Sequence, residues 1–162
     1  TNVIAVVGSE KKREIALQYG ADEVINYQSE DVRRRIKELT DARGIDVCFE
    51  MIGGDLFEVM ARSMNWNGRL LPIGFASGEI PYLKMNLPLV KNYSIVGSVV
   101  GAWWERSRPE AIKVNDEIFR WASEDKIHPK TDRIMPLKEA RLALELLVKR
   151  EVTGRIALSV SM

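Results

Sequence analysis

The charged side chains that follow the first apolar run are the residues best suited to bind a ligand. The run Asn2–Val7 ends at Gly8-Ser9, and the first acid after it is Glu10. Two cations, Lys12 and Arg13, come next. A small hydroxyl followed by cations suits a phosphate group, because cations pair with phosphate oxygens whereas an acid repels them. The alternative interpretation is a solvated run of charges on a surface helix.

Glycines also end three later apolar segments. These ends read Ile52-Gly53, Gly74-Phe75-Ala76 and Val99-Val100-Gly101. In open parallel α/β sheets, ligands lie beyond the carboxyl ends of the strands. A glycine there lets a ligand approach the backbone, and an aromatic such as Phe75 can wall a flat ring. The alternatives are that Phe75 belongs to the core and that Gly53 serves a tight turn.

No catalytic residue can be assigned from the sequence. Cys48 lies inside an apolar segment and is predicted to be a buried filler rather than a nucleophile. Because it is the only cysteine and His128 the only histidine, a disulfide within the chain and a zinc site built from these two types alone are excluded. Asp46 and Glu50 alternate with apolar residues and form no evident acid–base pair. Trp103-Trp104 is open to three interpretations: a substrate mouth, a subunit interface or local packing.

Alternating strands and helices are expected to position these residues. The predicted strands are Asn2–Val7, Glu23–Tyr27, Ile45–Phe49, Gly68–Gly74 and Tyr93–Val100. The predicted helices are Glu10–Tyr19, stopped by Gly20; a segment capped by Ser29 and running to Leu39; Asp55–Ser63; and Pro109–Ser123. Such alternation predicts an α/β fold with a doubly wound parallel sheet.

The pattern changes after Lys126, where a subdomain boundary is predicted. Residues 1–126 form the main domain in this interpretation, and residues 127–162 form a strand, a helix and a strand. The expected bounds of these elements are His128–Met135, Leu137–Lys149 and Arg155–Val160.

Bulk properties narrow the classes of function. The net charge of +1 gives no general attraction to nucleic acid or acidic membranes. No apolar run approaches the ~20 residues of a membrane span, and no signal peptide is evident. We therefore expect neither a nucleic-acid nor a membrane partner, and a cytoplasmic location.

Four motifs in a fixed order make the chain recognisable. They are Gly8-Ser-Glu-Lys-Lys12, Gly20-Ala-Asp-Glu-Val-Ile-Asn-Tyr27, Gly44-Ile-Asp-Val47 and Gly68-Arg-Leu-Leu-Pro-Ile-Gly-Phe75. Together with the ending from Pro136 through Thr153-Gly-Arg155, they resemble the quinone-oxidoreductase (zeta-crystallin-like) branch of the medium-chain dehydrogenase/reductase superfamily. The resemblance spans essentially the whole chain and implies the nucleotide-binding half of such a protein, with a Rossmann-type fold.

The resemblance implies NADPH as the cofactor and assigns residues to it. Lys12, Tyr27 and Arg150 match positions that bind the 2′-phosphate, beside Ser9. Ile52 and Gly53 would line the adenosine side. The residues that would flank the nicotinamide are Gly74, Phe75, Ala76, Val99 and Val100.

Parts that this family places upstream are not present in the sequence. No G-x-G-x-x-G occurs, although the family has a strand and a Gly-rich turn before the segment that begins here. We therefore expect a fragment whose sheet lacks its first, central strand. The strands Asn2–Val7 and Ile45–Phe49, which are strands 2 and 4 in the family's numbering, would then have unpaired edges. We expect them to pair directly, in the order 3-2-4-5-6, or to be completed by swapping with a second chain. We also expect a homo-oligomer through the edge strand at residues 93–100.

Two hypotheses follow for the function. The first is the cofactor-binding portion of a zinc-independent NADPH oxidoreductase that passes hydride to a quinone, enone or related carbonyl compound, and is inactive as this fragment. The second is a non-catalytic oligomerisation or interaction module that has kept the fold and lost the cofactor. The physiological acceptor and the catalytic residues are not specified by these residues.

Overall fold

The computed structural model describes residues 1–160, which form two compact units. The first unit spans Thr1–Ala102, and the second runs from Trp103 onward. The subdomain boundary near residue 126 was predicted from a change in the sequence pattern, and it stays a prediction.

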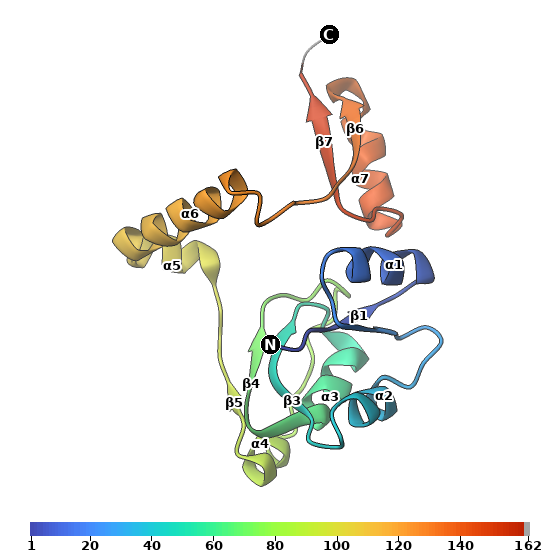
Figure 1. Ribbon diagram of the computed structural model, residues 1–162, viewed down its shortest axis with the longest axis vertical. Coiled ribbons are helices and arrows are strands. Elements are labelled where there is room, and N and C mark those ends of the chain that lie inside the picture. Colours follow the sequence, from blue (N-terminus) through green and yellow to red (C-terminus); the bar gives the residue numbers. More distant parts are fainter. Residues whose placement is uncertain (161–162) are drawn as a thin grey trace. The chain divides into compact units, whose positions relative to one another are not determined.

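The first parallel pair of strands begins the first unit (Figure 1). Strand β1 (Ile4–Val7) pairs with β2 (Glu23–Asn26), and α1 (Glu10–Gln18) connects them. The β-branched run of β1 favours an extended strand. Helix α1 ends as predicted at Gly20, whose φ of 90° is readily adopted only by glycine. There the Gly20 and Ala21 N–H groups donate to the carbonyls of Leu17 and Ala16, which closes the helix end.

A second, three-stranded sheet completes the first unit. It consists of β3 (Ile45–Glu50), β4 (Met64–Pro72) and β5 (Ser94–Ile95), all parallel. The helices between the strands of this unit are α2 (Val32–Leu39), α3 (Gly54–Ser63) and α4 (Asn86–Lys91). Asp31 rather than the predicted Ser29 caps α2, because its side chain accepts the Arg34 N–H. The α/β class with parallel sheets is confirmed.

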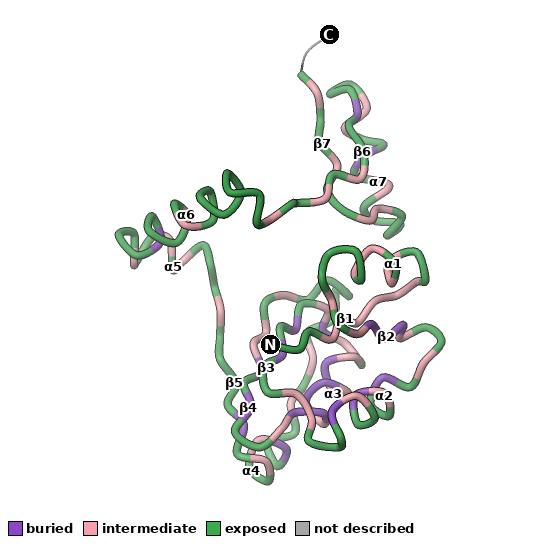
Figure 2. Tube along the Cα trace, in the orientation of Figure 1, coloured by how far each residue is buried: buried purple, intermediate pink, exposed green. Residues whose placement is uncertain are grey.

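One apolar cluster joins the two sheets. Ile25 of β2 and Ile36 of α2 are fully buried, as are Met64 and Leu70 of β4, and all four belong to this cluster. Figure 2 shows buried positions along β2, β4, α2 and α3. Helices α2 and α3 pack against each other within it. The cluster therefore fixes β1 and β2 relative to the second sheet.

The predicted pairing of Asn2–Val7 with Ile45–Phe49 is wrong for the described chain. The strands of the first unit form the orders β1-β2 and β3-β4-β5, and no ladder joins β1 to β3. The ladder of β1 is with β2, whose Ile25 packs in the cluster with Ile36, so β1 is held through β2. Phe49 of β3 stays 66% exposed in this arrangement. Swapping with a second chain, which a single chain does not test, stays a prediction.

The fifth strand is much shorter than the predicted Tyr93–Val100. Ser94 and Ile95 pair with Arg69 and Leu70, and the Val96 N–H donates to the Leu70 carbonyl. The same register places Pro72 opposite Gly97. Proline has no N–H, so it cannot continue the ladder. The chain then leaves the sheet, and α5 (Val100–Arg106) begins at a residue that the prediction put in the strand.

The second unit contains a long helix and a parallel strand pair. Helix α6 (Arg108–Ser123) is followed by β6 (Thr131–Pro136), a 3-10 turn η1 (Leu137–Glu139), α7 (Ala140–Val148) and β7 (Arg155–Ser159). Strands β6 and β7 pair in parallel, with Ile134 opposite Ala157. The strand–helix–strand pattern predicted for the C-terminal segment is confirmed. Among the residues up to 160, no helix is both long and apolar enough to cross a membrane.

Asp132 connects β6 to the loop before β7, and its protonation in acid should lower the stability of the fold. Its carboxylate accepts the Thr153 hydroxyl and pairs with Arg133 Nε at 2.8 Å, and these contacts lower its pKa from 3.8 to about 2. The resulting stabilisation is complete above the unfolded pKa and is lost as the pH falls through the folded pKa. Urea unfolding should therefore show the gap in stability between wild type and Asp132→Asn shrinking from about pH 5 to about pH 2. A gap independent of pH would contradict this role.

Candidate cofactor site

The carboxyl ends of β1 and β2 bring three of the predicted residues into one corner. Ser9 caps α1, and its hydroxyl accepts the Lys12 N–H at 3.3 Å. The Tyr27 N–H donates to the Val7 carbonyl at 2.9 Å, which sets Tyr27 beside the end of β1. Ser9, Lys12 and Tyr27 thus share the edge of the sheet where parallel strands present ligands.

Gly8 brings the tyrosine ring into this corner. A methyl group placed on Gly8 would lie 2.5 Å from the Tyr27 hydroxyl oxygen and 2.8 Å from its ring carbon Cζ. These distances are far below van der Waals contact, so the ring lies directly across the Gly8 Cα. A glycine at the strand end is therefore required for the observed position of Tyr27.

Acids near the corner are already paired. Glu10 Oε1 accepts the Asn26 side-chain amide at 2.6 Å, and Glu10 Oε2 pairs with Arg13 Nε at 3.0 Å. Arg13 also donates to the Val24 carbonyl at 2.6 Å and pairs with Glu30. The Asn26 N–H and Arg13 hold the pKa of Glu30 below its usual range. Arg13, which the sequence grouped with Lys12 as a phosphate ligand, belongs instead to the network that fixes α1 on β2.

A substitution at Gly8 tests the packing of Tyr27. In Gly8→Ala the new methyl group should expel the phenol from the corner and leave the Lys12 side chain in place. We expect a loss of about 3- to 10-fold in the ratio of NADPH to NADH affinity, the scale of one ordinary hydrogen bond. Tyr27→Phe, which removes only the hydroxyl group, is the matched comparison. Fluorescence titration measures the affinities of both variants for the two nucleotides. An unchanged ratio in Gly8→Ala would contradict the assignment of Tyr27.

The ends of β3 and β4 form a second group of predicted residues. Across this edge, the Ala76 N–H donates to the Met51 carbonyl at 2.9 Å and the Ser77 N–H to the Ile52 carbonyl at 2.8 Å. The Phe75 ring lies against Gly53, with Cδ1 3.3 Å from the place of a methyl group there. The structure therefore brings together the two short segments Ile52-Gly53 and Gly74-Phe75-Ala76.

Other predicted residues lie outside these two groups. Val99 precedes α5 and Val100 begins it; the two are 69% and 65% exposed and lie beyond the end of β5. Arg150 follows α7 in the second unit, with a φ of 58° and its N–H donated to the Leu147 carbonyl. Their places beside the nicotinamide and the 2′-phosphate stay predictions.

Glu50 lies beside the second group, and the sequence reasoning assigned it no role. It is 3% exposed at the end of β3, and its carboxylate accepts the backbone N–H groups of Ile52 and Gly53. The sequence shows only an acid at the end of an apolar strand, three residues before Gly53, and that pattern does not reveal where its carboxylate lies. The neighbouring Cys48 is buried as predicted, and burial, aided by the Glu50 charge, raises the pKa of its thiol to about 12. A thiol with this pKa is unsuited to nucleophilic chemistry.

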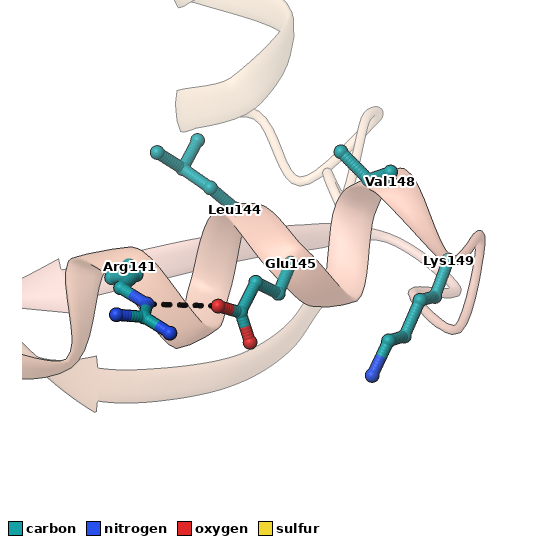
Figure 3. Close-up of a pocket in the computed structure, with 5 residues that line it drawn as sticks. All are labelled: Arg141, Leu144, Glu145, Val148 and Lys149. Carbon is teal, nitrogen blue, oxygen red and sulfur yellow. Dashed lines mark hydrogen bonds and ion pairs between the residues drawn. The ribbon is translucent and has the colours of Figure 1, made fainter.

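A surface hollow elsewhere in the molecule does not involve these residues. It runs along α7 in the second unit (Figure 3) and is lined by Arg141, Leu144, Glu145, Val148 and Lys149. Arg141 Nε pairs with Glu145 at 2.9 Å, so these two charges satisfy each other. Over the described residues, no group of three or more His, Cys, Asp or Glu side chains is placed to hold a metal ion.

Comparisons with known proteins place the chain in a family. The sequence profile of the family described as zinc-binding dehydrogenase matches residues 1–117. The chain therefore belongs to the zinc-binding dehydrogenase family.

Individual relatives define the branch. Quinone oxidoreductase-like protein 2 of Rattus norvegicus is 32% identical over 157 residues, which cover 97% of this chain and 45% of the rat protein. Quinone oxidoreductase 1 of Escherichia coli K12 is 27% identical over 154 residues, covering 94% and 47%. The crystal structure of Escherichia coli quinone oxidoreductase complexed with NADPH matches with a TM-score of 0.87 at 26% identity, covering 97% of this chain and 49% of that one. The chain spans about half the length of these relatives, and its resemblance to the quinone-oxidoreductase branch is confirmed.

Proposed function

We propose that this chain is the NADPH-binding portion of an oxidoreductase that passes hydride to a quinone, enone or related carbonyl compound. The observation that carries the proposal is the corner at the ends of β1 and β2. Glu10, an acid beside it, is held by Asn26 and Arg13, and we assign Lys12 and Tyr27 to bind the ribose 2′-phosphate. NADPH-bound Escherichia coli quinone oxidoreductase, which shares this fold, supports the choice of cofactor.

The remaining residues have roles in holding the cofactor. NADPH, when bound, supplies the hydride. Gly74 has no side chain to obstruct the end of β4, and a methyl group there would meet only the Met51 carbonyl oxygen, at 3.9 Å. The nicotinamide can therefore approach the backbone, with Phe75 as a wall on one side. We assign no catalytic residue within this chain.

Activity with two nucleotides tests the proposal. The full natural polypeptide that contains this chain should oxidise NADPH in the presence of a simple benzoquinone, followed by the absorbance of the reduced nicotinamide. NADH should support a much lower kcat/KM. Equal use of both nucleotides would overturn the cofactor assignment, and no oxidation with quinones, enones or aldehydes would overturn the proposed reaction.

These 162 residues alone should bind NADPH very weakly. They contain no G-x-G-x-x-G, the element that presents backbone N–H groups to the cofactor pyrophosphate. Isothermal calorimetry with this chain should give a Kd above the micromolar range and no quinone reduction. Micromolar binding would show that the pyrophosphate is held by residues outside our assignment.

Several further properties belong to the same proposal. We propose a homo-oligomer through residues 93–100, supported by the exposure of Ile95, Val96 and Val99 beside a short edge strand. We also propose that the enzyme works without zinc, since Lys12 and Tyr27 can bind a phosphate group without a metal ion. A cytoplasmic location and a small-molecule substrate complete it.

A further inference from the structure

The carboxylate of Glu50 is buried against the backbone that follows it. Its Oε1 accepts the Ile52 N–H at 2.9 Å and the Gly53 N–H at 3.0 Å, and Oε2 lies 3.1 Å from the same Gly53 nitrogen. The Glu50 carbonyl oxygen also accepts the Ile73 N–H, at 2.7 Å. This one residue therefore holds the turn after β3 with its side chain and the end of β4 with its main chain.

The turn held by Glu50 in turn holds the segment that carries Phe75. The carbonyls of Met51 and Ile52 accept the N–H groups that flank Phe75 on its C-terminal side, those of Ala76 and Ser77. Farther along the same segment, the Glu79 carbonyl accepts the Gly54 N–H at 3.2 Å. Two hydrogen bonds that share Ile52 thus connect the Glu50 carboxylate with the backbone that follows Phe75.

The conformation of the turn needs such an anchor. Gly53 has a φ of 75° and a ψ of −156°, a region that is sparsely populated and accessible essentially only to glycine. Gly53 is also the N-cap of α3 and has no side chain to cap it. A carboxylate at this end satisfies free N–H groups and is favoured by the helix dipole. Hydrogen bonds to a charged acceptor are about twice as strong as those to a neutral one, so an amide at position 50 would hold the turn less firmly.

We propose that Glu50 is a positioning residue that sets the place of Phe75 through the Met51–Gly53 turn. The consequence for the cofactor rests on the proposed function, in which Phe75 walls the nicotinamide. The structural part of the proposal does not rest on it. The two parts therefore have separate tests.

Amide hydrogen exchange on this chain tests the structural part without any cofactor. In Glu50→Gln, the amides of Ile52, Gly53, Ala76 and Ser77 should exchange about 3- to 10-fold faster than in wild type, the scale of one weakened hydrogen bond to a charged group. The core amide of Leu70 should change much less. Glu58→Gln is the matched control, because it removes the same charge from the side of α3 that faces Arg62 and Lys84. Equal acceleration at Leu70 and Ser77, or none at Ala76 and Ser77, would overturn the proposal.

A double-mutant cycle tests the functional part in the full natural polypeptide. Glu50→Gln should weaken NADPH binding by about 3- to 10-fold and shift the fluorescence of bound NADPH, which reports on the surroundings of the nicotinamide. In a Phe75→Ala background, the same substitution should have little further effect. Full additivity of the two substitutions would overturn the role of Glu50 toward the cofactor.

The outcomes also separate this proposal from the proposed function. Should the wild-type polypeptide bind no NADPH, the proposed function fails and the role toward the cofactor fails with it. The exchange experiment would still decide whether Glu50 positions Phe75. Should NADPH bind tightly while the cycle is additive, the proposed function stands and the positioning role is wrong.

Discussion

Replacing Lys12 with alanine is expected to weaken NADPH binding by roughly 10- to 150-fold, the range of one charge-assisted contact to phosphate. The affinity for NADH should be nearly unchanged, because NADH has a ribose hydroxyl where NADPH has the 2′-phosphate. The Michaelis constants of the full natural polypeptide for both nucleotides measure the effect.

A neighbouring lysine provides the control for this experiment. Lys11 is exposed on α1, whereas Lys12 is partly buried and its N–H is bound by the Ser9 cap. Lys11→Ala removes the same charge and should leave both constants nearly unchanged. Equal losses for NADPH and NADH in Lys12→Ala would contradict its role as a phosphate ligand.

Replacing Gly53 with alanine should have the largest effect on the fold. The new methyl group would lie 2.5 Å from the Glu79 carbonyl oxygen, and the φ of 75° is one that side chains disfavour. Strain and overpacking together should lower the free energy of unfolding by about 3 kcal/mol. The displaced turn should also release Phe75 and abolish measurable NADPH binding in the full natural polypeptide.

Gly78 separates these two causes. It also has a positive φ, of 85°, but no atom lies within 4 Å of the place of its methyl group. Gly78→Ala should therefore cost only about 1 kcal/mol, the conformational part of the penalty. Urea unfolding of both variants measures the difference. Equal costs would mean that the contact with Glu79 does not restrain the turn.

Local patterns in the sequence were enough to predict much of the fold. The β-branched run before Gly8 and the apolar stripe from Val32 to Leu39 have their own periodicity, and Gly20 ends its helix by a rule that needs no tertiary contact. The placement of ligands at the carboxyl ends of parallel strands also follows from topology alone. The positions of the two groups of candidate residues at those strand ends could therefore be predicted from the sequence.

Features that depend on register or on packing between elements were not predictable in this way. Strand β5 ends early because its register sets it beside Pro72, and register is not visible in either segment alone. Strand β1 pairs with β2 and not with β3, and both pack on one cluster that contains Ile25 and Ile36, whereas the prediction weighed only the unpaired strand edges. Glu50 has the spacing of an ordinary strand residue, and only the fold returns its carboxylate to the turn.

Calorimetric titration of the full natural polypeptide with NADPH and with NADH tests the central claim most directly. The two nucleotides differ only by the 2′-phosphate, so the ratio of their dissociation constants measures what the corner at Gly8, Lys12 and Tyr27 contributes. We predict that NADPH binds at least about 10-fold more tightly, as one charge-assisted phosphate contact requires. Equal affinities, or tighter binding of NADH, would contradict the account.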